Sequence, residues 1–171
     1  MASQTFRLAL TSGLTLAHGK PCTRSRAALL RIEAGPYVKC VIVRGGTRRW
    51  IIGVDDPHHY GCDDLDGALE AVPANAFKVV LAHSPEMFDQ AAAAGIHLYL
   101  CGHTHAGQIR LPWIGAPLLN ADCPRAYAHG QWQHGAMLGY TSAGVGCSLL
   151  PVRYNCPPEI VLIELVKKRS P

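Results

Sequence analysis

The apolar positions of the chain fall into short runs, and the clearest of them begin near residue 37. The first two runs, YVKCVIV and WIIGV, flank Gly45 and Gly46, which is typical of a β-hairpin. The later runs, such as FKVVLA and IHLYLC, have the length of buried strands. The pattern therefore predicts strands over residues 37–43, 50–54, 77–82, 96–101, 137–142 and 160–166.

Two segments between these runs have the features of helices. Residues 63–72 place acids in the first turn and end before Pro73, and a second helix is expected from Ser84-Pro85-Glu86 through Ala94, ending at Gly95. Residues 112–135 are rich in Pro, Gly, Asn and Trp without a period, so a long ordered loop is expected there. Strands that alternate with helices indicate an α/β or mixed fold.

The composition is that of a globular protein with one core. Hydrophobic residues make up 49% of the 171 positions and charged residues 16%, which excludes a disordered chain. No apolar run approaches the length that crosses a bilayer. The seven cysteines include no C-x-x-C pair, which favours free thiols in a reducing compartment. We therefore expect a cytoplasmic location, peripheral on the inner membrane if the chain meets a membrane at all.

Charge is distributed unevenly along the chain. Nine of the sixteen Lys and Arg residues lie in residues 1–50, where Glu33 is the single acid. Such a basic arm could bind nucleic acid, but no aromatic residues are interleaved with the basic ones as in an RNA-binding face. We expect no nucleic-acid partner. Residues 1–36 are interpreted as a basic segment without a recognisable pattern, disordered or non-native, and residues 37–171 as the folded part.

Three histidines follow the ends of two predicted strands. His83 comes directly after FKVVLA, and His103 and His105 come after IHLYLCG. Strand ends are where loops gather polar groups over a rigid sheet. Imidazole is the commonest side-chain ligand for zinc-like ions, and Gly102 lets the backbone bend just before the pair. The three histidines are candidate metal ligands.

These residues carry a resemblance to a known family. Residues 81–112 (LAHSPEMFDQAAAAGIHLYLCGHTHAGQIRLP) closely resemble the C-terminal metal-binding region of calcineurin-like metallophosphoesterases. Residues 144–165 look like the end of a bacterial branch that includes membrane-associated phosphodiesterases and UDP-diacylglucosamine pyrophosphohydrolases. Residues 50–69 are similar to the segment preceding the first histidine motif. The resemblance covers about residues 40–166.

The resemblance implies a fold, a cofactor and a reaction. The fold would be α/β (α+β), a partial four-layer αββα sandwich of mixed β-sheets flanked by helices. His83 and His103 would ligate one divalent ion and His105 a second, the ions being Mn, Fe, Zn or Ni. A metal-dependent hydrolase of phosphoester or pyrophosphate bonds would follow. Its substrate would be a phosphorylated small molecule or a lipid-linked nucleotide, and peripheral membrane association would fit the branch.

The family pattern is incomplete in this sequence. Family members also carry D-x-H, G-D and G-N-H motifs, and no G-N-H occurs among the 171 residues. Asp56-Pro57-His58 spells D-x-H but lies too close to His83 to be the family's first motif. We therefore identify no catalytic leaving-group histidine, and we expect a truncated enzyme in which this chain holds at most one ion firmly. D-x-H, G-D and G-N-H should then be encoded upstream.

Several other residues are candidates for substrate binding. Arg153 and Asn155 could contact an anion or fix a loop, and we favour loop fixing. The full set of such candidates is Gln108, Arg110, Arg153, Asn155, Asp56 and His58. Two alternative functions stay open: a non-catalytic remnant that binds a metal or a partner, and, less favoured, a nucleic-acid binder that uses the basic arm.

Overall fold

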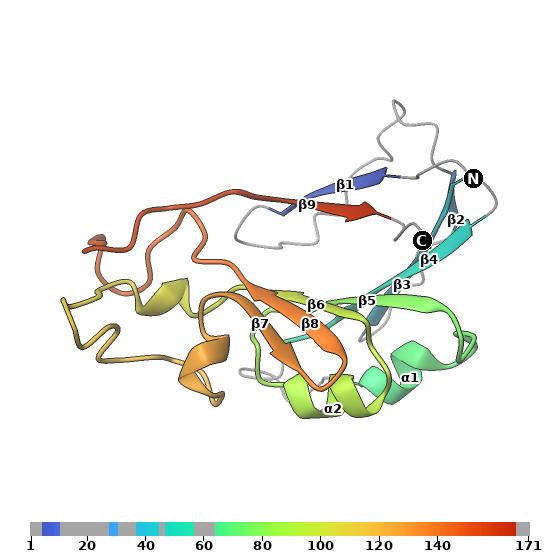
Figure 1. Ribbon diagram of the computed structural model, residues 1–171, viewed down its shortest axis with the longest axis horizontal. Coiled ribbons are helices and arrows are strands. Elements are labelled where there is room, and N and C mark those ends of the chain that lie inside the picture. The colour runs from blue at the N-terminus through green and yellow to red at the C-terminus, as the bar shows by residue number, and fades with distance from the viewer. Residues whose placement is uncertain (1–4, 11–27, 31–36, 45–46, 57–63, 167–171) are drawn as a thin grey trace, which may run out of the picture.

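The computed structural model describes residues 5–10, 28–30, 37–44, 47–56 and 64–166 (Figure 1). Seven strands form one mixed sheet in the order β2-β3-β4-β5-β6-β8-β7. The strands β4, β5, β6 and β8 run parallel to one another, whereas β2, β3 and β7 are antiparallel to their neighbours. Their bounds are β2 Ala28–Leu30, β3 Tyr37–Arg44, β4 Thr47–Val54, β5 Phe77–Leu81, β6 Leu98–Cys101, β7 Gly130–His134 and β8 Met137–Thr141.

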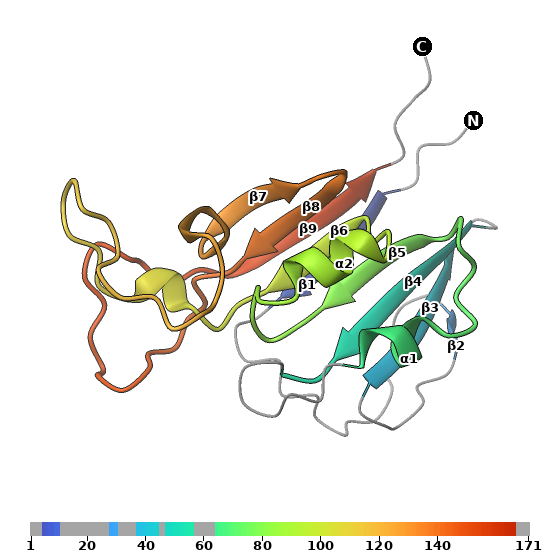
Figure 2. The same cartoon turned by 90° about the horizontal axis from the view of Figure 1, so that it is seen from below.

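Helices and a second sheet lie on opposite faces of this sheet. Helices α1 (Leu65–Leu69) and α2 (Phe88–Ala93) cover one face, and β9 (Val161–Val166), paired antiparallel with β1 (Thr5–Leu10), lies over the other (Figures 1 and 2). The expected partial mixed α/β sandwich is confirmed: helices, the large sheet and the small sheet follow one another as layers. Among the described residues, no helix has the length and apolarity needed to cross a bilayer.

The main core lies between the large sheet and its helices. Ile52 of β4, Val80 of β5 and Tyr99 of β6 are fully buried, and Ala91 of α2 packs in the same cluster. The apolar runs that predicted β5 and β6 are thus the residues that this core removes from water. The Asp64 carboxylate caps α1 by accepting the backbone N–H of Gly67 at 2.8 Å. This core fixes the strands whose ends carry the candidate site.

The start of the second predicted helix differs from the structure. The second helix begins at Phe88, so the prediction that Ser84-Pro85-Glu86 opens it is wrong. The hydroxyl of Tyr99 donates to the Ser84 carbonyl at 2.8 Å, and Ser84 is fully buried. This tertiary hydrogen bond holds residues 83–87 as a bend and delays the helix. It also keeps His83 at the end of the strand rather than in a helical turn.

The structure contains strands that the sequence pattern did not predict. Residues 130–134 form β7, at the edge of the sheet, within the stretch expected to be loop. Only Trp132 of this strand is fully inside, while Gln131 and Gln133 are exposed, so no apolar run marks it. The described parts of residues 1–36 also include β1 and β2. Gly45 and Gly46 of the predicted hairpin turn lie outside the described residues, but β3 and β4 pair as expected.

Candidate metal site at the carboxyl edge of the sheet

The parallel strands bring the candidate residues to one edge of the sheet. Asp56 follows β4, His83 follows β5, and His103 and His105 follow β6. Two backbone hydrogen bonds continue the β5–β6 ladder past the strand ends, from Ala82 N–H to the Leu100 carbonyl at 3.1 Å and from Gly102 N–H to the His83 carbonyl at 3.0 Å. The two histidine loops are therefore held together by main chain before any side chain contributes.

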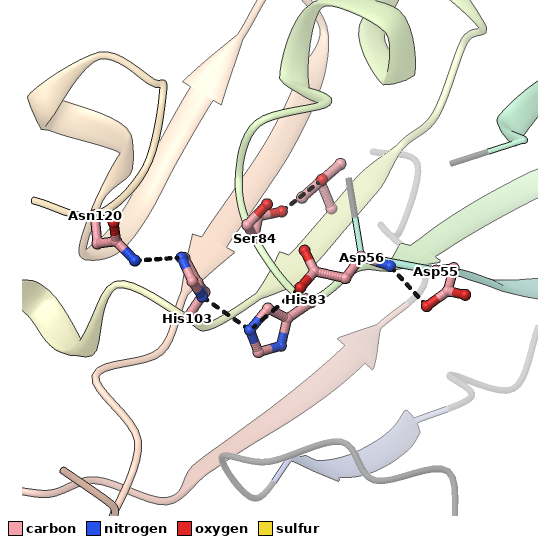
Figure 3. Close-up of polar contacts among 7 residues, drawn as sticks. Asp55, Asp56, His83, Ser84, His103 and Asn120 are labelled. Atoms are coloured by element: carbon pink, nitrogen blue, oxygen red, sulfur yellow. Dashed lines mark hydrogen bonds and ion pairs between the residues drawn. The ribbon is translucent and has the colours of Figure 1, made fainter. Parts of the chain in front are cut away.

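His83 and His103 lie side by side in the structure. Nδ1 of His103 is 2.8 Å from Nε2 of His83, and the ring centroids are 4.7 Å apart at an angle of 62° (Figure 3). Both rings are accessible from a pocket of about 740 Å³, and His105 lines the same pocket. The structure thus brings two of the three predicted ligands into direct contact, with a nitrogen of each facing the other, and places the third in the lining of the same pocket.

The loop that carries His103 and His105 has a strained backbone. His103, His105 and Ala106 all have positive φ, at 68°, 49° and 55°. Each such non-glycine residue costs about 1–3 kcal/mol, and strain of this kind clusters at functional sites. The loop is held by Thr104, whose hydroxyl donates to the Ala128 carbonyl at 2.6 Å and whose oxygen accepts the Ala106 N–H. The buried threonine between the histidines therefore anchors their conformation.

Asp56, a predicted substrate contact, lies next to His83. Its side chain is buried, with 8% of the residue exposed, and its Oδ2 is 4.0 Å from Nε2 of His83 (Figure 3). The backbone N–H of Asp56 donates to the Asp55 carboxylate at 2.8 Å, which fixes the turn after β4. A carboxylate at this distance attracts a protonated or metal-bound imidazole. His58 lies outside the described residues.

His105 lines the same pocket but has a different partner. Nη2 of Arg153 donates to Nδ1 of His105 at 3.3 Å, so the ring proton of neutral His105 lies on Nε2. Burial, then the charge of Arg153, lowers the pKa of His105 from 6.5; the Ala143 carbonyl opposes this shift and His83 adds to it. His105 is therefore held in the neutral form that metals bind. Ligation through Nε2 would require Arg153 to release Nδ1.

This lowered pKa predicts a dependence of stability on pH. As the pH falls below 6.5, His105 of the unfolded chain binds a proton while His105 of the folded chain, with its lower pKa, stays neutral. The free energy of unfolding therefore decreases as the pH falls from 6.5 toward the folded pKa. We expect the urea midpoint to be lower at pH 5.5 than at pH 7.5, and the difference to shrink in His105→Gln. The exposed His129 offers a control, and an equal pH dependence in His105→Gln and His129→Gln would contradict this account.

The other predicted substrate-binding residues make contacts within the chain. Gln108 accepts the Ser148 N–H at 2.6 Å and donates to the carbonyls of Ser148 and Leu150. Arg110 donates to the Ala106 carbonyl at 3.0 Å. Arg153 donates to the carbonyls of Ala143 and Gly146, besides its contact with His105.

These contacts favour loop fixing over substrate binding for Gln108 and Arg153. Gln108 holds the segment that forms one wall of the pocket, and Arg153 joins the loop after β8 to His105. Their side chains thus have loop-fixing partners, whereas Asn155 is exposed with a φ of 48°. Substrate contact by any of the four stays a prediction.

One residue at the site was not predicted from the sequence. The side-chain nitrogen of Asn120 lies 3.4 Å from Nε2 of His103, on the side of the ring away from His83 (Figure 3). Asn120 stands in the aperiodic stretch after the histidine pair, 17 residues from His103. No spacing rule links such a position to the site. A polar side chain in an otherwise apolar P-L-L-N segment was the single available signal.

The outer wall of the pocket is apolar. Leu118, Leu149 and Leu150 line it and are 81%, 103% and 60% exposed. Trp113 and Ile114, in the loop just before Leu118, are 102% and 69% exposed. The lining of the pocket therefore combines imidazoles with exposed apolar side chains, and we call Leu118, Leu149 and Leu150 its apolar lip. A ligand that fills it would place polar atoms at the histidines and carbon against the leucines.

The donor set fits a single transition-metal ion better than a complete two-ion centre. Two ligand nitrogens about 2.1 Å from one ion, at an angle between 90° and 110°, lie about 3.0–3.4 Å apart. The 2.8 Å separation of His83 and His103 approaches this range, and a small rotation of either ring reaches it. Within the part of the chain that the structure describes, no three His, Cys, Asp or Glu side chains are grouped to hold a metal ion.

Comparison with known proteins gives several metallophosphoesterases as relatives. The chain is 32% identical over 120 residues to the metallophosphoesterase YkuE of Bacillus subtilis, a match of 70% of this chain and 41% of that protein. It is 42% identical over 96 residues to the phosphodiesterase YaeI of Escherichia coli, covering 56% of this chain and 35% of YaeI. A Bos taurus transmembrane protein with a metallophosphoesterase domain is 33% identical over 132 residues, or 71% of this chain and 28% of that protein.

The chain spans less than half the length of these relatives. No protein-family model matches it, and no solved structure matches it at a comparable level of significance. The relatives share the name metallophosphoesterase or phosphodiesterase, and the structure joins the A-H-S-P and G-H-T-H loops around two facing imidazoles. These matches support a place for the chain in the calcineurin-like metallophosphoesterase family.

Proposed function

We propose that His83 and His103 hold one divalent ion and that the complete protein hydrolyses a phosphoester or pyrophosphate bond. The observation that supports this most directly is the 2.8 Å approach of Nε2 of His83 to Nδ1 of His103 in the lining of a pocket. Histidine with carboxylate accepts Mn, Fe, Zn or Ni, so the donors leave the choice of ion open. Bound divalent ions of this kind lower the pKa of a coordinated water and neutralise charge on a phosphoryl group.

The chain's own residues have distinct roles in this proposal. His83 and His103 supply the two neutral nitrogens, and the buried Asp56 places negative charge beside His83. Thr104 holds the strained loop in its conformation. His105 would serve a second ion once Arg153 releases its Nδ1. Arg153 would then be free to contact an anionic substrate, which joins the two roles considered for it.

The proposed site needs ligands beyond these three histidines. The 171 residues contain no G-N-H, the family element that supplies a leaving-group histidine. Three imidazoles without a bridging carboxylate hold one ion at most firmly, and a single ion does not clamp a phosphoryl group between two charges. We propose that activity requires the D-x-H, G-D and G-N-H motifs that the family resemblance implies for a complete member. A non-catalytic metal-binding role for the chain by itself is the alternative.

The apolar lip of the pocket favours a substrate with an apolar portion. Leu118, Leu149 and Leu150 stand within the pocket wall but keep most of their surface exposed. Burying such side chains against a hydrocarbon group stabilises a complex by about 25 cal/mol per Å². We propose a lipid-linked phosphate or nucleotide as substrate, with Trp113 and Ile114 in contact with the membrane surface. The protein would then associate peripherally with the inner membrane from the cytoplasm.

The activity of the chain can be tested with a chromogenic diester. We expect no Mn²⁺-dependent hydrolysis of bis-p-nitrophenyl phosphate above the rate of buffer with Mn²⁺, because a single ion lacks the two-ion clamp on the attacking and leaving oxygens. The same chain extended by upstream coding sequence that supplies D-x-H, G-D and G-N-H should hydrolyse it. Turnover by the 171-residue chain that is abolished in His105→Ala would contradict the expected incompleteness.

A further inference from the structure

The contact between Asn120 and His103 determines which nitrogen of His103 can bind a metal. A neutral imidazole carries one proton, so one ring nitrogen donates and the other presents a lone pair. The amide of Asn120 lies 3.4 Å from Nε2, whereas Nδ1 faces His83 at 2.8 Å. The amide oxygen and nitrogen exchange places by a half-turn of the side chain, so Asn120 can accept from Nε2 or donate to it. Only the accepting orientation leaves Nδ1 unprotonated.

We propose that Asn120 is a positioning residue for metal binding, because its amide oxygen accepts Nε2–H of His103. The lone pair of Nδ1 is then directed at the point that His83 also faces. Partners of this kind fix the tautomer and orientation of ligating histidines in metalloproteins. The inference rests on the proposed binding of an ion by His83 and His103. It adds a residue from the segment that the sequence predicts to be a long ordered loop.

The loop that carries Asn120 is built to hold it at this position. The Arg125 guanidinium donates to the Ala116 carbonyl at 2.6 Å, which closes residues 116–125 into a compact loop. The backbone N–H of Asp122 donates to the Glu86 carboxylate at 3.0 Å, which ties this loop to the bend that follows His83. Hydrogen bonds between side chains and main chain therefore hold the loop on both sides of Asn120.

Gly107 allows this loop to approach the histidine loop closely. Its φ is +80°, and a Cβ at this position would lie 2.2 Å from Cβ of Ala116 and 3.0 Å from the Leu118 carbonyl oxygen. A side chain at residue 107 would push the segment that leads to Asn120 away from His103. The glycine that ends the G-H-T-H-A-G motif thus serves the contact between the two loops.

Metal titration of the purified 171-residue chain tests the role of Asn120. Co²⁺ would be added to the metal-free protein, with affinity measured by calorimetry and by the visible absorption of the bound ion. Asn120→Ala should weaken binding by about 10-fold or more, the effect typical of losing such a partner. Asn120→Asp retains an acceptor and should bind at least as tightly as the wild type. Exposed Asn75, at the opposite end of β5, provides matched controls in Asn75→Ala and Asn75→Asp.

The tautomer itself gives a second readout that needs no metal. Long-range ¹H–¹⁵N correlation spectra of the metal-free chain, at a pH where the imidazoles are neutral, distinguish protonated from unprotonated ring nitrogens. We expect the Nε2–H form of His103 in the wild type and in Asn120→Asp, and a mixture of both forms in Asn120→Ala. A wild-type His103 protonated on Nδ1 would overturn the proposal, as would an unchanged tautomer in Asn120→Ala.

The outcomes separate this inference from the proposed function. Tight Co²⁺ binding by the wild type that is unaltered in Asn120→Ala overturns the role of Asn120 and leaves the histidine site intact. A wild type that binds no Co²⁺ removes the metal site and the role of Asn120 with it. Weaker binding in Asn120→Ala, with affinity retained in Asn120→Asp and in both Asn75 variants, supports the assignment. Equal losses in Asn120→Ala and Asn120→Asp contradict it, because an acceptor would then not suffice.

Discussion

Replacement of His103 by alanine should abolish tight binding of a divalent ion by this chain. The structure directs Nδ1 of His103 and Nε2 of His83 at each other, so losing one ring leaves a single imidazole and a carboxylate 4.0 Å from it. The loss should exceed the roughly 10–100-fold that removal of an outer hydrogen-bond partner costs. His83→Ala should have an effect of the same size. Zn²⁺ or Co²⁺ titration by calorimetry gives the affinities.

Two other histidines of the described region provide comparisons for this experiment. His105→Ala should change the affinity little in the 171-residue chain, because Arg153 occupies its Nδ1. The exposed His129 serves as a matched control, and His129→Ala should bind as the wild type does. Unchanged metal content in both His83→Ala and His103→Ala would refute the assignment of the two ligands.

Gly139→Ala should be among the most destabilising single changes outside the site. Gly139 of β8 stands directly opposite Trp132 of β7, and a Cβ at residue 139 would lie 2.3 Å from atoms of the indole ring. The indole is buried, stacks on Tyr127 with centroids 4.6 Å apart, and donates its N–H to the Thr141 hydroxyl at 2.9 Å. Displacing it disturbs the core and a buried hydrogen bond together, at an expected cost of about 3 kcal/mol.

Urea unfolding, followed by far-ultraviolet circular dichroism, measures this cost. Gly135→Ala is the control: Gly135 precedes β8 in the chain, with φ at +57° and nothing within 4 Å of an added Cβ. Its cost should be confined to backbone strain of about 1–2 kcal/mol. The double variant with Gly139→Ala and Trp132→Leu should lose less unfolding free energy than the sum of the losses in the two single variants, because both changes act on the same contact. A Gly139→Ala variant with the wild-type midpoint would show that the indole does not need the space above the glycine.

The parts of the fold that the sequence predicts are those in which burial and local pattern agree. Val79, Val80 and Leu100 belong to apolar runs, and the structure buries them in parallel strands. β7 was missed because its glutamines face water and Trp132 alone faces the core. The predicted start of α2 is wrong because the hydroxyl of Tyr99, which is distant in the sequence, donates a hydrogen bond to the Ser84 carbonyl. Contacts between segments far apart in the sequence leave no periodic signal.

The same distinction applies to the candidate site. His83 and His103 could be predicted to meet because each follows a buried strand, and parallel neighbouring strands end at the same edge. The sequence predicts Asp56 as a substrate contact, whereas in the structure its carboxylate lies beside His83. Asn120 reaches His103 through a loop whose shape depends on Arg125, Glu86 and the absent side chain of Gly107. Residue type and spacing carry no information about such a loop.

NMR in solution can test directly whether the facing nitrogens of His83 and His103 bind a metal ion. The chain, labelled with ¹⁵N at histidine, would be titrated with Zn²⁺ while the ring nitrogens are followed by NMR. One equivalent of ion should shift Nε2 of His83 and Nδ1 of His103 and leave the nitrogens of His129 and His134 where they were. If Zn²⁺ instead moves other imidazoles, or saturates the protein without altering either of these two nitrogens, the histidine pair is not a metal site and the proposed hydrolase centre is wrong.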